Sequence, residues 1–266
     1  MSSRPIPRPD ISARGAARLA GICYAAIFVL AIYANFAVRM RLVDPSDAAA
    51  TTQNLAQSDG QVRLAVAAFT IVFLLDIAIA WALYVVFRPY GPRRALLAAW
   101  FRLGYTILLG AACVFLFLAL RLATSSTFAD GFGPDADAAA VMLTIEAFDY
   151  LWLIGLAAFG IHLVLIGRII VTARPAPVLL GWILIVSGGA YLVDTFAHVL
   201  LADYSTFAPM FLVMVALPSI CGELWFTLWL MIRAGRGGNA RPAANRPGSP
   251  HRDRRRPNLS QEDVRT

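Results

Sequence analysis

The sequence contains no lysine, only three cysteines and three histidines, and few charged residues for its length. Charged residues make up 15% of its 266 positions, against about a quarter in a typical soluble domain. Hydrophobic residues make up 59%, and the mean hydropathy is +0.67. These values exclude an ordinary soluble domain. We therefore expect an integral membrane protein, with the lipid bilayer as its partner.

All 23 basic residues are arginine, and the formal net charge is +7. Using arginine alone is typical of a GC-rich genome and indicates a bacterial source. The cysteines, Cys23, Cys113 and Cys221, all fall within apolar segments and at different predicted depths. This placement excludes a disulfide framework and favours ordinary packing of small apolar side chains.

Six apolar segments are long enough to cross a hydrocarbon core about 30 Å thick. Each is predicted to be a helix, because a helix satisfies its own backbone polar groups in lipid. A basic leader, residues 1–18, precedes the first segment, which is too long for a signal peptide and is predicted to be an uncleaved anchor. The fold class is thus an all-α membrane protein, a six-helix bundle whose transmembrane domain covers residues 19–232. The predicted spans are residues 19–38, 64–87, 95–120, 148–170, 178–201 and 208–232.

The connections alternate between short basic loops and longer or acidic ones. The positive-inside rule then places both termini in the cytoplasm, with 18 arginines inside and only Arg39, Arg41, Arg63 and Arg121 outside. We expect a multi-pass protein of the bacterial inner (plasma) membrane. On its outer side, residues 124–146 are predicted to form a long acidic loop. In the first outer loop, Asp44 is predicted to cap a short surface helix whose first position is Pro45.

Residues 233–266 are rich in Arg, Pro and Gly and contain almost no apolar residues, so this tail is predicted to be disordered. Two interpretations remain open for it. It binds anionic lipids of the inner leaflet, at about 1 kcal/mol for each nearby arginine, or it is a solubilising topology anchor. No nucleic-acid partner is expected, because no aromatic residues are interleaved with the arginines to stack on bases.

Ionisable residues lie well inside five of the predicted spans. A charge at the bilayer centre costs about 2.5 to 3.5 kcal/mol on insertion scales, so such side chains normally face the bundle interior and find partners. Helical spacing places Tyr191 on the same face as two of them, and Ser219 on the same face as a third. The candidate polar network consists of Asp76, Arg102, His162, Asp194, His198 and Glu223.

Depth along the helices divides these residues into two groups. Asp76, Arg102 and Glu223 are predicted to cluster, and Asp194 and His198, at positions i and i+4, are predicted to bond to each other closer to the outer surface. The imidazoles of His162 and His198 are separated by about 18 Å at the rise of a helix, too far to share a metal. We expect no metal and no cofactor, and the chain has no GxSxG nucleophile elbow.

Several stretches resemble a known family. They include "ARGAARLAGICYAAIFVLAIYANFAVR" followed by "DPSDAAATTQNL", "LDIAIAWALYVVFRP" with Asp76, and "FRLGYTILLG" with Arg102. Further on come "GIHLVLIGRII" with His162, "LLGWILIVSGGAYLVDTFAH" with Asp194, and "CGELWFTLWLMI" with Glu223. Over about residues 14–235 the chain is similar to the membrane-protein family described as domain of unknown function 4386. The resemblance implies six helices and no defined activity, and it sets His198 and the tail apart as peculiar to this chain.

Three function classes follow from the network. The leading hypothesis is a non-enzymatic membrane protein with a structural or ligand-sensing role, in which polar contacts join the helices or line a site for an unidentified small-molecule ligand. The second is a small-molecule or proton-coupled transporter, and the third is an intramembrane enzyme. A site of converging polar groups favours the second or third, and a dry, fully paired network favours the first.

Overall fold

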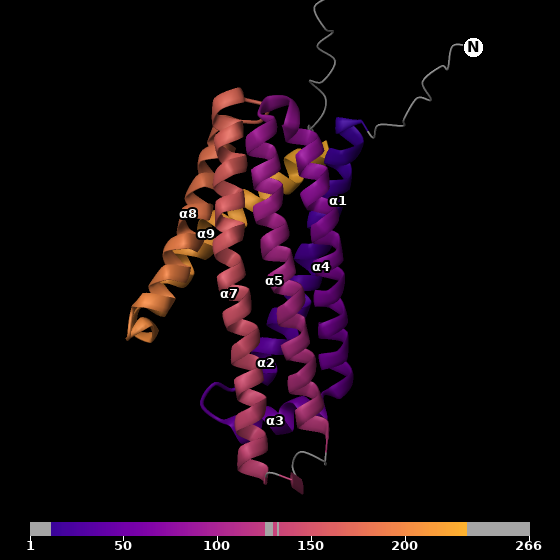
Figure 1. Cartoon of the computed structure of the whole chain (residues 1–266), viewed down its shortest axis with the longest axis vertical. Helices are drawn as coiled ribbons and strands as arrows, with labels where there is room; N and C mark the ends of the chain where they lie inside the picture. Colours follow the sequence, from indigo (N-terminus) through magenta and orange to yellow (C-terminus); the bar gives the residue numbers. More distant parts are fainter. Residues whose placement is uncertain (1–11, 126–129, 132, 233–266) are drawn as a thin grey trace, which may run out of the picture.

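The structure is a computed structural model that describes residues 12–125, 130–131 and 133–232. Every regular element in these ranges is a helix (Figure 1). The predicted disordered tail, residues 233–266, and most of the predicted leader lie outside the described residues.

Within the described residues, six helical segments are long and apolar enough to cross a membrane, as predicted. The first is continuous through three elements, α1 (Ala13–Ala31), the π-helical η1 (Ile32–Arg39) and α2 (Met40–Leu42). It begins ahead of the predicted apolar span because Ser12 caps it, accepting a hydrogen bond from the Gly15 amide at 3.1 Å. The others are α4 (Asp59–Phe87), extended by η2 (Arg88–Tyr90), then α5 (Pro92–Thr124), α7 (Pro134–Ala173), α8 (Val178–Leu200) and α9 (Tyr204–Ile232).

The six spans form a closed ring in chain order. Each packs against its neighbours in sequence, and α9 closes the ring against α1. The start of α1, the α4–α5 and α7–α8 connections and the end of α9 all lie toward one end of the bundle, while α3 lies near the other (Figure 1). The two short basic loops therefore lie at the same end of the bundle as the start of α1 and the end of α9.

The predicted first outer loop does contain a short helix, α3 (Ala48–Gln57), but the predicted cap is wrong. The cap is Asp47, whose carboxylate accepts from the Ala50 amide at 2.8 Å. The Asp44 carboxylate instead accepts from the hydroxyl and the amide of Ser46 at 2.7 and 2.9 Å, and these bonds lower the pKa of Asp44. Asp44 thus closes a turn around Pro45, and the helix starts three residues later than predicted.

The predicted acidic loop over residues 124–146 is largely wrong as well, because α7 already begins at Pro134. Proline is favoured at the first position of a helix. Asp135 and Asp137 lie in the first turn, where negative charge stabilises the positive end of the helix dipole. Counting apolar residues alone missed this start, since the acidic residues that made the stretch look like a loop belong to the helix.

Glycines allow α7 and α8 to approach closely. A Cβ atom added at Gly160 would lie 2.6 Å from the carbonyl oxygen of Gly188, and one added at Gly167 would lie 2.5 Å from that of Gly181. The backbones themselves are therefore in contact at two levels, as small residues permit in membrane helices.

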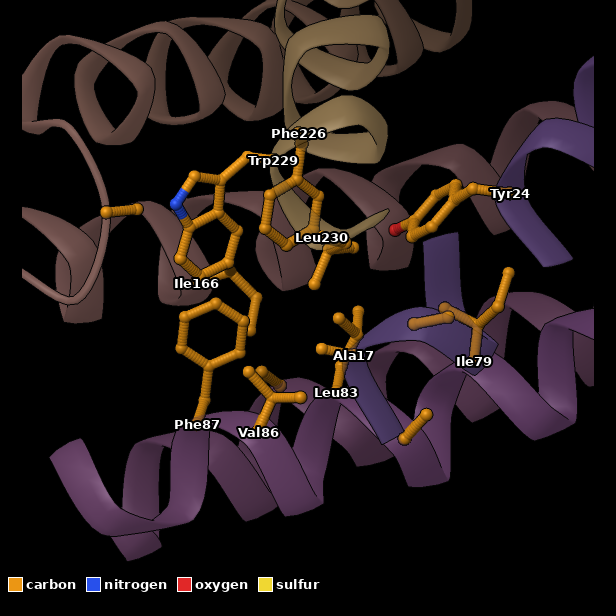
Figure 2. Packing of buried hydrophobic residues seen from close by; sticks show 14 of the residues in the cluster. Ala17, Tyr24, Ile79, Leu83, Val86, Phe87, Ile166, Phe226, Trp229 and Leu230 are labelled. Atoms are coloured by element: carbon orange, nitrogen blue, oxygen red, sulfur yellow. The ribbon is translucent and has the colours of Figure 1, made fainter. Parts of the chain in front are cut away.

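The core consists of two apolar clusters, one toward each end of the bundle. In the first, side chains of α9 face those of α4 (Figure 2). Phe87 stacks on Phe226 and Trp229 with ring centroids 6.1 and 6.2 Å apart. In the second, Phe69 and Phe148 pack at 5.5 Å. On α4 the interval between Phe69 of one cluster and Ile79 of the other contains Asp76, so the polar site lies between two apolar layers.

Candidate functional site, an intramembrane polar network

The centre of the site is an ion pair between Asp76 of α4 and Arg102 of α5. The Arg102 guanidinium donates from Nε at 3.0 Å and from Nη2 to the same carboxylate oxygen, Oδ1. Both side chains are only 2% exposed. The predicted contact between these two residues is confirmed.

Two hydroxyl groups complete this pair. Thr106, one turn after Arg102, donates to the other carboxylate oxygen of Asp76 at 2.5 Å. The Tyr24 hydroxyl on α1 accepts from Nη1 of Arg102, and the guanidinium carbon lies 4.7 Å from the centroid of the Tyr24 ring. The ring of Phe159 lies at 5.3 Å. The charge is thus matched, hydrogen-bonded and flanked by aromatic faces, which is the condition for retaining a buried pair.

His162 of α7 is the third member, fully buried. Its Nε2 lies 3.3 Å from Nη1 of Arg102, and its Nδ1 lies 2.9 Å from the carbonyl oxygen of Ala98. A guanidinium only donates, so Nε2 accepts. The hydrogen-bond pattern therefore assigns the proton to Nδ1, which donates to Ala98, and the imidazole is neutral. His162 links α7 to α5 through both ring nitrogens.

Glu223 of α9 has a different environment. Its carboxylate accepts one long hydrogen bond, from the Tyr191 hydroxyl of α8 at 3.4 Å, and it has no further side-chain partner among the described residues. The residue is half-buried rather than buried. One turn before it, Ser219 is 5% exposed, and its hydroxyl has no hydrogen-bond partner in the described part of the chain. Glu223 lies beside the network, but without the direct contact to Arg102 that the sequence predicted.

The predicted bond between Asp194 and His198 is wrong. Asp194 accepts a hydrogen bond from the Tyr204 hydroxyl at the start of α9, at 2.7 Å. The imidazole of His198 instead packs on the Tyr204 ring, with centroids 4.1 Å apart. Tyr204 therefore contacts both Asp194 and His198, because the short α8–α9 connection places it against the last turns of α8. This group ties α8 to α9 and is separate from Arg102.

A second ion pair, not predicted from the sequence, joins the first span to α7. Arg39 donates from Nη1 to Asp149 at 2.5 Å and from Nε to Asn35 at 2.8 Å. Asn35 and Arg39 lie four residues apart within η1, a spacing at which helical side chains are neighbours. The sequence predicts Arg39 in the first outer loop, because it follows an apolar run. In the structure, the first helical span continues through Arg39.

The residues that sequence reasoning missed are mostly uncharged. Tyr24 and Tyr204 complete the buried groups, but a tyrosine in an apolar span carries no charge that marks it. Helical spacing did place Tyr191 on the face of Asp194. Within the described ranges, no three His, Cys, Asp or Glu side chains gather closely enough to hold a metal ion.

Comparisons with known proteins agree with the architecture and give no activity. A family model described as "Domain of unknown function (DUF4386)" matches residues 19–234. The chain is similar to an "Uncharacterized protein" of Archaeoglobus fulgidus, with 24% identity over 163 residues, which are 61% of this chain and 79% of that protein. No solved structure matches the chain.

Proposed function

Because the chain belongs to the family described as domain of unknown function 4386, which names no activity, we propose its function from geometry alone: a non-enzymatic, ligand-sensing membrane protein. In this proposal the buried pair of Asp76 and Arg102 is the scaffold, and Glu223 is the group that binds a small ligand. The observation that carries the proposal is the contrast between the two carboxylates.

Asp76 has little capacity left for a ligand. Its two oxygens accept three hydrogen bonds, two from Arg102 and one from Thr106, and it is 2% exposed. Glu223 has one partner at 3.4 Å and is half-buried. An ionised carboxylate accepts about four hydrogen bonds, so Glu223 retains most of its capacity. It lies one helical turn from Ser219, whose hydroxyl has no hydrogen-bond partner among the described residues. Intramembrane ionisable residues of this kind mark functional sites.

Native mass spectrometry of the full chain released from mild detergent tests this proposal. The wild type is expected to carry a discrete small molecule or lipid that Glu223→Gln loses. Asp194→Asn is the matched control, since it also neutralises an intramembrane carboxylate with a tyrosine partner and should retain the bound mass. Equal loading of wild type and Glu223→Gln, or no bound mass in either, would reject a ligand at Glu223.

A proton-coupled transporter is the second candidate, and the pair of half-buried carboxylates favours it. Glu223 and Asp194 both lie in α8–α9 and both accept from a tyrosine hydroxyl. A carrier needs such a group to exchange protons. In proteoliposomes, proton flux that depends on an added solute and is lost in Glu223→Gln would select transport over sensing.

We also propose that the protein resides in a bacterial inner membrane with both termini in the cytoplasm. The excess of arginine at the end of the bundle that contains the start of α1 and the end of α9 supports this orientation. Reporter fusions test it. A fusion after Asp203 is expected to be active only with a periplasmic reporter, and one after Tyr90 only with a cytoplasmic reporter.

A further inference from the structure

We propose the chemical class of the ligand, an inference that rests on the proposed ligand site at Glu223. The ligand is an organic ammonium ion with an apolar body, and it reaches Glu223 from the bilayer. The site combines a carboxylate, hydroxyl groups and aromatic rings beside a lipid-facing helix surface.

Among the described residues, no basic side chain forms an ion pair with Glu223. Arg102 is the nearest basic side chain in the network, and all three of its nitrogens are engaged, two by Asp76 and one by Tyr24 and His162. The Asp76–Arg102 pair is neutral as a unit, and His162 is neutral by its hydrogen bonds. An ionised Glu223 therefore leaves a net negative charge at the site, which selects a cation.

The lining favours an ammonium ion over a metal ion. Tyr191, whose hydroxyl donates to Glu223, belongs to a continuous aromatic group: its ring centroid lies 5.7 Å from that of Phe159, which lies 5.1 Å from that of Tyr105. Aromatic rings attract ammonium groups through their electron-rich faces. A calcium ion needs about six to eight oxygen ligands, which this single carboxylate does not provide.

Ser219 supplies a second point of contact. It lies one helical turn before Glu223 on the same face of α9, and its buried hydroxyl oxygen has no hydrogen-bond partner in the described chain. An ammonium group with several N–H donors can bond to Glu223 and to this oxygen together. A bare proton on Glu223 would leave Ser219 unpaired.

Access is from the lipid side. Ile220 and Leu224, which flank Glu223 on α9, are 56% and 44% exposed, and Glu223 is itself partly exposed. The surface around the carboxylate is thus apolar and faces the hydrocarbon. A ligand that arrives there keeps an alkyl or aryl body in lipid while its charged end reaches the carboxylate.

Hexylammonium chloride, with hexan-1-ol as the neutral analogue of similar size, tests this inference. The full chain is placed in phosphatidylcholine nanodiscs, and binding is followed by the shift of the thermal unfolding midpoint over a concentration series. We expect saturable binding of hexylammonium to wild type and to Asp194→Asn, binding at least tenfold weaker to Glu223→Gln, and no saturable effect of hexan-1-ol.

Equal binding of hexylammonium to wild type and Glu223→Gln would overturn the inference, as would equally tight binding of hexan-1-ol. If Glu223→Gln does not fold, Ser219→Ala decides: several-fold weaker binding is expected, and unchanged binding overturns the inference. A native mass that depends on Glu223, without any hexylammonium binding, would retain the proposed ligand site and reject only the ammonium class. Failure of both assays would reject both.

Discussion

Arg102 directs two of its nitrogens at one oxygen of Asp76, while Thr106 takes the other oxygen. The pair joins α4 to α5, and through Tyr24 and His162 it also holds α1 and α7. Four of the six spans therefore meet at one charge pair in the layer between the two apolar clusters. This arrangement makes the pair a fixed part of the bundle rather than a group free to bind.

Removing one member of the pair is expected to cost more than removing both. Arg102→Met leaves Asp76 buried and unpaired, and we expect a loss of about 3 to 5 kcal/mol in the free energy of unfolding. The double variant Asp76→Leu with Arg102→Met removes both charges and should recover a large part of that loss. Reversible unfolding in mixed micelles measures both, and a double variant as unstable as the sum of the two single variants would contradict this assignment.

His162 is expected to be a neutral imidazole with its proton on Nδ1. Nitrogen-15 NMR of the histidine side chains distinguishes this tautomer from the Nε2–H form and from imidazolium. The assignment follows from Nε2 facing the guanidinium of Arg102 and Nδ1 facing the carbonyl of Ala98. His198, which packs on Tyr204 near the end of α8, serves as the internal reference, and an Nε2–H signal from His162 would refute the assigned network.

The contact between α7 and α8 is expected to depend on Gly188 and not on its neighbour Gly189. A Cβ at position 188 meets the carbonyl of Gly160, whereas one at position 189 meets nothing within 4 Å. Gly188→Ala should therefore lose about 1 to 3 kcal/mol, as overpacking does. Gly189→Ala should be neutral or gain up to about 1 kcal/mol from helix propensity. Equal effects in thermal unfolding would show that the helices are not in backbone contact.

Tyr204 is expected to hold the α8–α9 connection through its hydroxyl. Tyr204→Phe keeps the ring that packs on His198 but removes the donor to Asp194, and a loss of about 1 kcal/mol is typical of one such hydrogen bond. Tyr150→Phe is the control, because its ring also faces His198 while its hydroxyl has no hydrogen bond among the described residues. Hydrogen exchange over residues 196–206 should increase in the first variant only.

The sequence predicted the six spans because each must be apolar over its whole length, a requirement that leaves a clear pattern. It also predicted the contact of Asp76 with Arg102, because opposite charges within a membrane-spanning bundle are stabilised when they pair. It could not predict that Asp194 bonds to Tyr204 rather than to His198, because that choice depends on the path of the short connection between α8 and α9. The early start of α7 was missed because Asp135 and Asp137 serve a helix terminus while resembling a loop.

The central claim is that the Asp76 carboxylate is part of the scaffold and the Glu223 carboxylate binds a ligand. The most direct test compares the free energies of unfolding of Asp76→Asn and Glu223→Gln in the same nanodiscs. Neutralising Asp76 leaves Arg102 without its counter-ion, so the unfolding free energy should fall by about 3 kcal/mol or more. Neutralising Glu223 removes a group with one long hydrogen bond, so the change should stay within about 1 kcal/mol. Losses of equal size would contradict the division of roles and make Glu223 part of the scaffold.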